Sequence, residues 1–193
     1  MENPRTKDIA PLLDRAARAT GQVVRGVTDA DLARPTPCAE YDVRGLLNHL
    51  FHVAVEFQKL AAKGTADFSA TPDYVEGDWR VRFGDETGRL VEAWSAPDAL
   101  EGVSQGMGMP QRTVAHMVMG DLAIHGWDLS RATGQDYAPD EAVLAELVPA
   151  FAELAPLARK MGQFGEEVPV PADATSLERL LAGTGRDPGW LPR

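Results

Sequence analysis

The 193-residue sequence contains one cysteine, Cys38, and no surplus of basic residues. A single thiol excludes an intramolecular disulfide and a cysteine-rich structural zinc site. Lysine and arginine number 19 against 29 aspartate and glutamate residues, which gives a formal net charge of -10 at pH 7. Such a chain lacks the positive charge with which proteins meet nucleic-acid phosphates or anionic membrane surfaces. We therefore expect neither a nucleic-acid partner nor a membrane partner.

Long apolar runs, period-two alternation and internal repeats are also missing. No segment approaches the roughly 20 apolar residues that a membrane-spanning helix needs. The N-terminal residues carry no apolar signal core, so the cytoplasm is the expected location. The absence of alternating apolar and polar residues disfavours β-strands. The hydrophobic fraction of 44% and the charged fraction of 25% are typical of a globular protein.

Apolar residues instead recur at intervals of three and four, which predicts helices. The predicted core helices span residues 7–26, 43–63, 78–95 and 110–133, followed by a C-terminal extension over about residues 140–193. Asp42 is expected to cap the second helix and Gly134 to end the fourth. Pro149 lies inside a predicted helix over residues 141–160 and is expected to kink or break it. The expected fold is one all-α domain over residues 1–193, a four-helix bundle with additional short C-terminal helices.

The helix predicted over residues 110–133 carries the strongest candidate for chemistry. Asp121 and His125 are four residues apart, so their side chains lie about 40° apart around the helix and about 6 Å apart along it. This spacing lets a carboxylate and an imidazole reach one metal ion. The same spacing is common in simple ion pairs and hydrogen bonds on helices. Because the surrounding residues are mostly apolar, the pair is expected to be buried, which costs several kcal/mol unless an ion or another partner compensates.

Other candidate residues have structural explanations that compete with functional ones. Asp128 either orients a ligand histidine or forms a salt bridge with Arg131. His52 is either a spare ligand or proton shuttle, or a partly exposed helix residue, and the second is favoured. Cys38 is either a reactive thiol ahead of a helix N-terminus or a small buried residue, and again the second is favoured. His116 is excluded as a co-ligand because it points about 140° away from the carboxylate of the pair.

Three sequence motifs resemble those of a known family. Residues 35–49 (PTPCAEYDVRGLLNH) resemble the signature that opens the second helix in the mycothiol-dependent maleylpyruvate isomerase N-terminal family, part of the DinB-like superfamily. Residues 121–134 (DLAIHGWDLSRATG) resemble the second signature of that family. The ending, from Phe164 to Trp190, is similar to an actinobacterial branch of metal-binding proteins. The resemblance covers nearly the whole chain, with the motifs in the right order.

The resemblance implies a DinB-like four-helix bundle with one divalent metal ion, zinc as the first expectation and nickel as the alternative. Its ligands would be His49 on the second helix and Asp121 and His125 on the fourth. Without the resemblance, His49 lies close to the apolar stripe of its helix and would pass for a hydrogen-bonded core histidine. Two imidazoles and one carboxylate leave a tetrahedral ion with one open position. Asp128 is then a candidate for orienting a ligand histidine.

Members of the superfamily use such an open position to bind a low-molecular-weight thiol, mycothiol or bacillithiol. A bound metal lowers the pKa of the thiol, so that a thiolate can attack an electrophilic small molecule at neutral pH. The expected function is a metal- and mycothiol-dependent transferase or isomerase, and the alternative is a non-catalytic module that binds a metal or small ligand. Isomerase members carry glutamate at the position of Asp121 and a separate α+β domain, so isomerisation of maleylpyruvate itself is not expected. The substrate and the oligomeric state are left open, with a homodimer as one option.

Overall fold

The computed structural model describes residues 9–192 as helices joined by loops. Within that range it contains six α-helices, one short 3-10 turn and no strand. The helices are α1 (Ile9–Gly26), α2 (Val43–Ala61), α3 (Trp79–Trp94), α4 (Gln111–Thr133), α5 (Glu141–Lys160) and α6 (Ser176–Gly183), and the turn η2 is Asp29–Asp31. The prediction of an all-α fold is confirmed. The expected start of the first helix at residue 7 lies outside the described residues.

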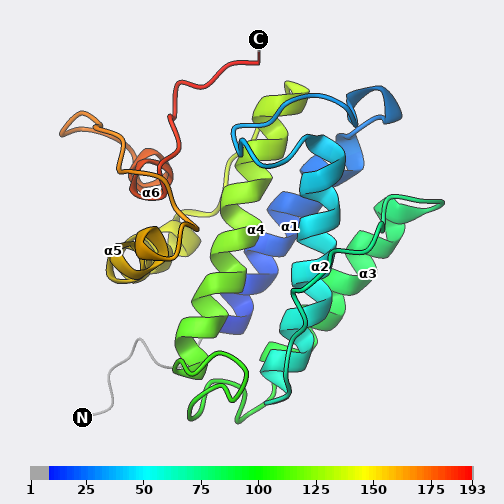
Figure 1. Cartoon of the computed structure of the whole chain (residues 1–193), viewed down its shortest axis with the longest axis vertical. Coiled ribbons are helices and arrows are strands. Elements are labelled where there is room, and N and C mark those ends of the chain that lie inside the picture. Colours follow the sequence, from blue (N-terminus) through cyan, green and yellow to red (C-terminus); the bar gives the residue numbers. More distant parts are fainter. Residues whose placement is uncertain (1–8, 193) are drawn as a thin grey trace.

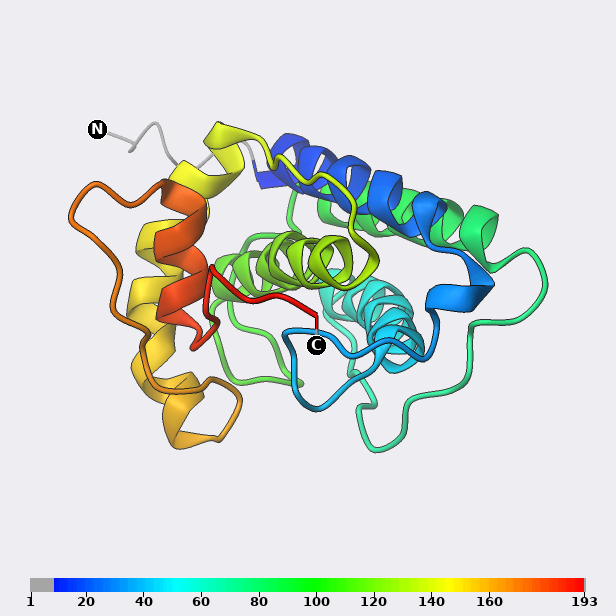
Figure 2. The same ribbon diagram turned by 90° about the horizontal axis from the view of Figure 1, so that it is seen from above.

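Helices α1 to α4 form a four-helix bundle (Figure 1). Around the bundle the order is α1, α3, α2, α4, so that α4 packs against both α1 and α2. Helices α5 and α6 pack together beside α4, on the side away from α3 (Figure 2). Helices α4 and α1 thus join the bundle to α5. No helix in the described part of the chain is long and apolar enough to cross a membrane.

Close packing holds α4 in place. Leu122 and Leu129 of α4 are fully buried. At Gly120 a β-carbon would lie only 1.9 Å from Cζ of Phe151, so the absence of a side chain lets α5 approach this closely. Gly134 ends the helix in the left-handed conformation, with a φ of 70°, as its position predicts. Residues on α4 therefore have fixed positions relative to α2 and α5.

A kink or a break was expected at Pro149, and the break does not occur, because α5 is continuous through this residue. A proline inside a helix removes one hydrogen bond and leaves the carbonyl four residues earlier without its donor. Both Pro149 and Ala145, the residue that provides this carbonyl, are exposed, so water can hydrate the free oxygen. The opposite face of α5 is buried through Leu144 and Leu147. Packing of that face stabilises the helix across the proline.

Candidate metal centre

Helices α2 and α4 bring His49, Asp121 and His125 together where they pack. One ligand atom of each side chain lies within 4.8 Å of those of the other two. Oδ1 of Asp121 is 3.7 Å from Nε2 of His125, and the two imidazole rings meet edge to face with centroids 4.9 Å apart. Two ligands of a tetrahedral zinc ion are about 3.3 Å apart, given metal–ligand distances near 2.0 Å. The three side chains need to move only slightly to reach that spacing, so the donor set fits a zinc-sized ion.

His49 has a buried nitrogen without a hydrogen-bond partner. Tyr41 stacks on its ring at a centroid distance of 5.3 Å, and Nε2 has no partner among the described residues. Burial, together with the charge of His125, lowers the pKa of His49 to about 3, so the ring is neutral at pH 7. A buried polar atom without a partner costs about 1–3 kcal/mol. A neutral imidazole with a free nitrogen is the form in which histidine binds a metal ion.

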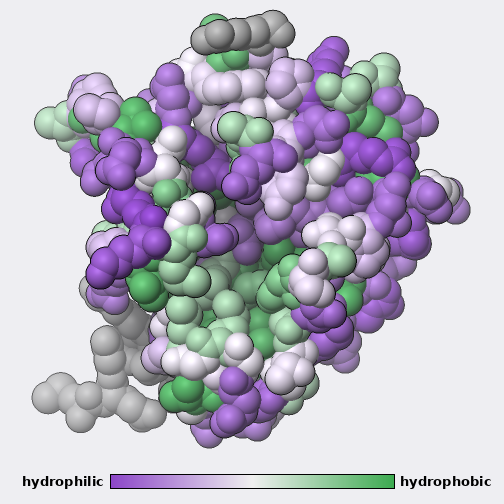
Figure 3. All heavy atoms as spheres, in the orientation of Figure 1, coloured by the Kyte–Doolittle hydropathy of each residue, from purple (hydrophilic) through white to green (hydrophobic). Residues whose placement is uncertain are grey.

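Asp121 lies on the open side of the cluster. Its side chain is 31% exposed, against 10% for His125. Burial of its remaining surface raises the pKa of the carboxyl group, although the charges of His125 and Arg186 act in the opposite direction. A cation at this position would compensate the loss of hydration of the carboxylate. Figure 3 shows a hollow in the molecular surface over α4, with a largely hydrophobic floor and a hydrophilic upper rim.

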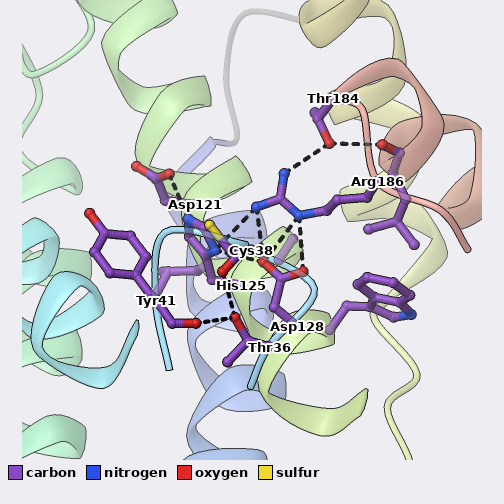
Figure 4. Close-up of polar contacts among 12 residues, drawn as sticks. Thr36, Cys38, Tyr41, Asp121, His125, Asp128, Thr184 and Arg186 are labelled. Carbon is purple, nitrogen blue, oxygen red and sulfur yellow. Dashed lines mark hydrogen bonds and ion pairs between the residues drawn. The ribbon is translucent and has the colours of Figure 1, made fainter. Parts of the chain in front are cut away.

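His125 is oriented by Asp128, which lies three residues further along α4 (Figure 4). Nδ1 of His125 is 2.8 Å from Oδ2 of Asp128. Burial acts to raise the pKa of Asp128, but the hydrogen bond with His125 and the charge of Arg186 outweigh it and lower the pKa. The carboxylate is therefore ionised and can only accept, so Nδ1 of His125 carries the proton. Nε2 is the ring nitrogen that faces Asp121, so it is the one placed to reach an ion shared with that carboxylate.

Asp128 is held in turn by Arg186, which follows α6. Nε of Arg186 lies 2.9 Å and 3.0 Å from the two carboxylate oxygens of Asp128, and Nη2 lies 2.9 Å from Oδ2. The salt bridge considered between Asp128 and Arg131 does not form, because Arg131 donates to the backbone carbonyl of Trp190 at 2.7 Å and 3.1 Å. Asp128 thus orients a histidine, the other role considered for it. The sequence alone did not indicate a role for Arg186. Its only signal there is that it lies in the C-terminal ending, which is similar to a branch of metal-binding proteins.

Two further histidines lie outside the cluster. His52 is 5% exposed, so the expectation of a partly exposed helix residue is wrong. The loop after α2 covers it: Nε2 lies 2.8 Å from the carbonyl oxygen of Asp67 and Nδ1 lies 3.2 Å from the hydroxyl of Tyr74. His116 contacts Glu146 on α5 at 2.8 Å and is not part of the cluster. Within the described residues, neither histidine belongs to a group of side chains that could share one metal ion.

Cys38 lies beside the cluster. Its Sγ is within 4.8 Å of a nitrogen of His125 and an oxygen of Asp128. The side chain is half-buried. Burial raises the pKa of the Cys38 thiol, and the charge of Arg186 opposes this effect only in part. The thiol is therefore protonated at neutral pH, which disfavours a reactive thiol. The favoured interpretation, a small buried residue, is met only in part, because the side chain is half-buried.

Comparisons with known proteins match the region that contains this cluster. Residues 13–130 match the family of the mycothiol maleylpyruvate isomerase N-terminal domain. Two proteins of Mycobacterium tuberculosis, one from strain CDC 1551 / Oshkosh and one from strain H37Rv, are each 29% identical to the chain over 180 residues, and both are named as uncharacterized. These matches cover 89% of this chain and 94% of each relative. No solved structure gives a significant match. Because the family match spans more than half of the chain and includes all three clustered residues, the protein belongs to the mycothiol maleylpyruvate isomerase N-terminal domain family.

Proposed function

We propose that the protein holds one divalent metal ion through His49, Asp121 and His125 and uses it to activate a low-molecular-weight thiol. The observation that carries the proposal is the open side of the cluster, where the Asp121 side chain is 31% exposed. A tetrahedral ion with three protein ligands retains one position for an external ligand. Two imidazole nitrogens and one carboxylate oxygen suit zinc, and nickel is the alternative.

The surroundings of the cluster favour this role over a purely structural ion. A structural zinc site is closed by four protein ligands. His52, the residue considered for a closing role, uses both ring nitrogens in contacts with Tyr74 and Asp67. Cys38 groups with His125 and Asp128, and within the described residues it does not share a group with His49.

Family membership supports mycothiol as the thiol. A bound divalent ion lowers the pKa of a thiol and so supplies a thiolate at neutral pH. The protein itself orients the site: Asp128 binds Nδ1 of His125 and so directs Nε2 toward Asp121, and Tyr41 packs on the ring of His49. Met117, one turn before the carboxylate on the same face of α4, is only partly buried and offers an apolar contact to a substrate. The proposed reaction is transfer of the thiol to a small electrophile, or thiol-dependent isomerisation of one.

Metal analysis of the purified protein tests the ligand assignment. We expect one ion per chain in the parent protein. His125→Ala should lose stoichiometric binding, because two remaining ligands rarely retain the ion. His116→Ala is a matched control, since it removes another histidine of α4 that contacts Glu146 and lies outside the cluster. Full metal occupancy in His125→Ala would refute the assignment.

Titration of the cobalt-loaded protein with mycothiol tests the thiol. Sulfur ligation should produce an intense sulfur-to-metal charge-transfer band in the near ultraviolet. Cys38→Ser should leave this band unchanged, which separates the sulfur of mycothiol from that of the nearby cysteine. His49→Ala should remove the band together with the ion. A fully loaded protein that shows no band with mycothiol or bacillithiol would leave the non-catalytic module as the function.

A further inference from the structure

The metal-ligand candidate His125 is connected to the C-terminal segment through Asp128 and by a longer direct contact, 3.4 Å between its Nδ1 and Nη2 of Arg186. Nδ1 of His125 is bonded to Asp128 at 2.8 Å, and both oxygens of Asp128 accept from Arg186. Figure 4 shows the Arg186 side chain reaching from the segment after α6 to this carboxylate. The segment, residues 183–190, begins with the last residue of α6 and lies along the last turns of α4 (Figure 2), where Arg131 binds the carbonyl of Trp190. It lies outside residues 13–130, the part of the chain that matches the family.

The contact between Arg186 and Asp128 is a buried ion pair with several hydrogen bonds. The Asp128 side chain has no exposed surface, and that of Arg186 is 12% exposed. Nη1 of Arg186 donates to Oγ1 of Thr184 at 3.1 Å, and this buried hydroxyl donates to the carbonyl of Leu181 at 2.8 Å. The planar guanidinium therefore holds the carboxylate in one orientation. That orientation is the one in which Oδ2 of Asp128 accepts from His125.

We infer that Arg186 is a positioning residue for His125 and that residues 183–190 form part of the metal centre. The inference rests on the proposed metal site. Groups that bind the second nitrogen of a ligand histidine typically change metal affinity by about 10–100-fold when they are replaced, and Arg186 acts on such a group, Asp128. Because one carboxylate both orients His125 and docks the C-terminal segment, metal binding and docking of the segment are coupled. Such coupling is reciprocal, so the metal also stabilises the docked segment.

Two neighbouring arginines provide matched variants. Arg186→Met keeps a long apolar side chain but removes the guanidinium, and Arg186→Lys keeps the charge without the two-point contact. Arg131→Met removes a different tether of the same segment, the bonds to the Trp190 carbonyl, and leaves Asp128 untouched. Zinc affinity is measured by competition with a chromophoric chelator. We expect a loss of about ten-fold or more for Arg186→Met, a smaller loss for Arg186→Lys, and an affinity close to that of the parent for Arg131→Met.

The spectrum of bound cobalt separates positioning from stability. A residue needed only for folding would lower the melting temperature but leave the visible bands of the folded, fully loaded protein unchanged. We expect shifted bands in Arg186→Met and parental bands in Arg131→Met. Hydrogen exchange of residues 183–190 should slow on metal binding in the parent and in Arg131→Met, but not in Arg186→Met.

Each outcome decides the inference. A folded Arg186→Met protein with the zinc affinity and cobalt spectrum of the parent would overturn it while leaving the proposed metal site intact. If Arg186→Met does not fold, the same comparison with Arg186→Lys decides, and parental values in that variant overturn the inference. A parent protein that binds neither zinc nor cobalt would overturn the proposed function and this inference together.

Discussion

The unpartnered nitrogen of His49 predicts opposite effects of one substitution on stability and on metal binding. His49→Phe keeps an aromatic ring in contact with Tyr41 and His125, whose ring centroids lie 5.3 Å and 4.9 Å from that of His49. It removes Nε2, which is buried without a partner among the described residues. Relief of such an atom is worth about 1–3 kcal/mol, against which the larger ring adds some crowding. We expect the metal-free variant to be more stable than the metal-free parent by about 1 kcal/mol, the lower end of that range.

Zinc should reverse this order. An ion that binds only the folded state stabilises it by about 2.7 kcal/mol when its free concentration is 100 times the dissociation constant. The free energy of unfolding of the parent should rise by this amount when zinc is added. The variant has lost one of three ligands, so its free energy of unfolding should rise little. The same substitution is thus expected to stabilise the metal-free protein and to destabilise the zinc-loaded protein relative to the parent.

Denaturant unfolding followed by circular dichroism, with a chelator and with excess zinc, measures both effects. His52→Phe is the matched control, because His52 is another buried histidine of α2 whose ring nitrogens contact Asp67 and Tyr74. It should lower the stability of the metal-free protein by about 1–3 kcal/mol, since it leaves buried partners unpaired, and should keep the zinc increment. A metal-free His49→Phe protein clearly less stable than the parent would refute the argument from the unpartnered nitrogen. An undiminished zinc increment in that variant would remove His49 from the ligand set.

Three further predictions concern stability in the absence of metal. Gly120→Ala places a β-carbon 1.9 Å from Cζ of Phe151 and should lower the free energy of unfolding by about 1–3 kcal/mol. Its control is Gly84→Ala, where a β-carbon would meet no atom within 4 Å and should raise the free energy of unfolding by about 0.5–1 kcal/mol. Equal free energies for the two variants in urea titrations would contradict the close α4–α5 packing. Thr175→Ala removes the capping box of α6 and should cost about 1 kcal/mol in the same titrations, whereas an unchanged midpoint would mean that α6 does not depend on its cap. Asp128→Asn leaves the buried guanidinium of Arg186 without its counter-charge and should lower the free energy of unfolding by about 3–5 kcal/mol. A decrease of less than about 1 kcal/mol, measured by thermal unfolding, would show that the pair is hydrated.

The helical fold could be predicted because its signals depend on residues a few positions apart. Asp42 caps α2 as expected, accepting from the backbone N–H of Gly45 at 2.7 Å. Gly134 takes the positive φ that ends α4. The spacing of Asp121 and His125 places both side chains on one face of α4 for the same local reason. Whether that face holds a metal ion stays a prediction.

Contacts between distant segments could not be predicted in this way. Arg186 and Asp128 are 58 residues apart, and their contact depends on how α5 and α6 fold back on α4. His52 was expected to be partly exposed, but the loop that carries Asp67 and Tyr74, 15 and 22 residues further on, covers it. In both cases the partner of a buried polar group is selected by tertiary packing, which no periodic pattern in the sequence encodes.

Arg186 also affects the charge that an external ligand of the metal centre would meet. Asp128 is ionised, but the buried guanidinium of Arg186 neutralises it. His49 is neutral at pH 7, and in the proposed site His125 would bind the ion through Nε2. Asp121 alone would then offset a divalent ion and would leave one net positive charge in a partly desolvated site, where charge interactions are stronger than in water. Without Arg186, the carboxylate of Asp128 would cancel that remaining charge. In the proposed site the ion pair would thus favour an anionic external ligand, such as a thiolate, over a neutral one.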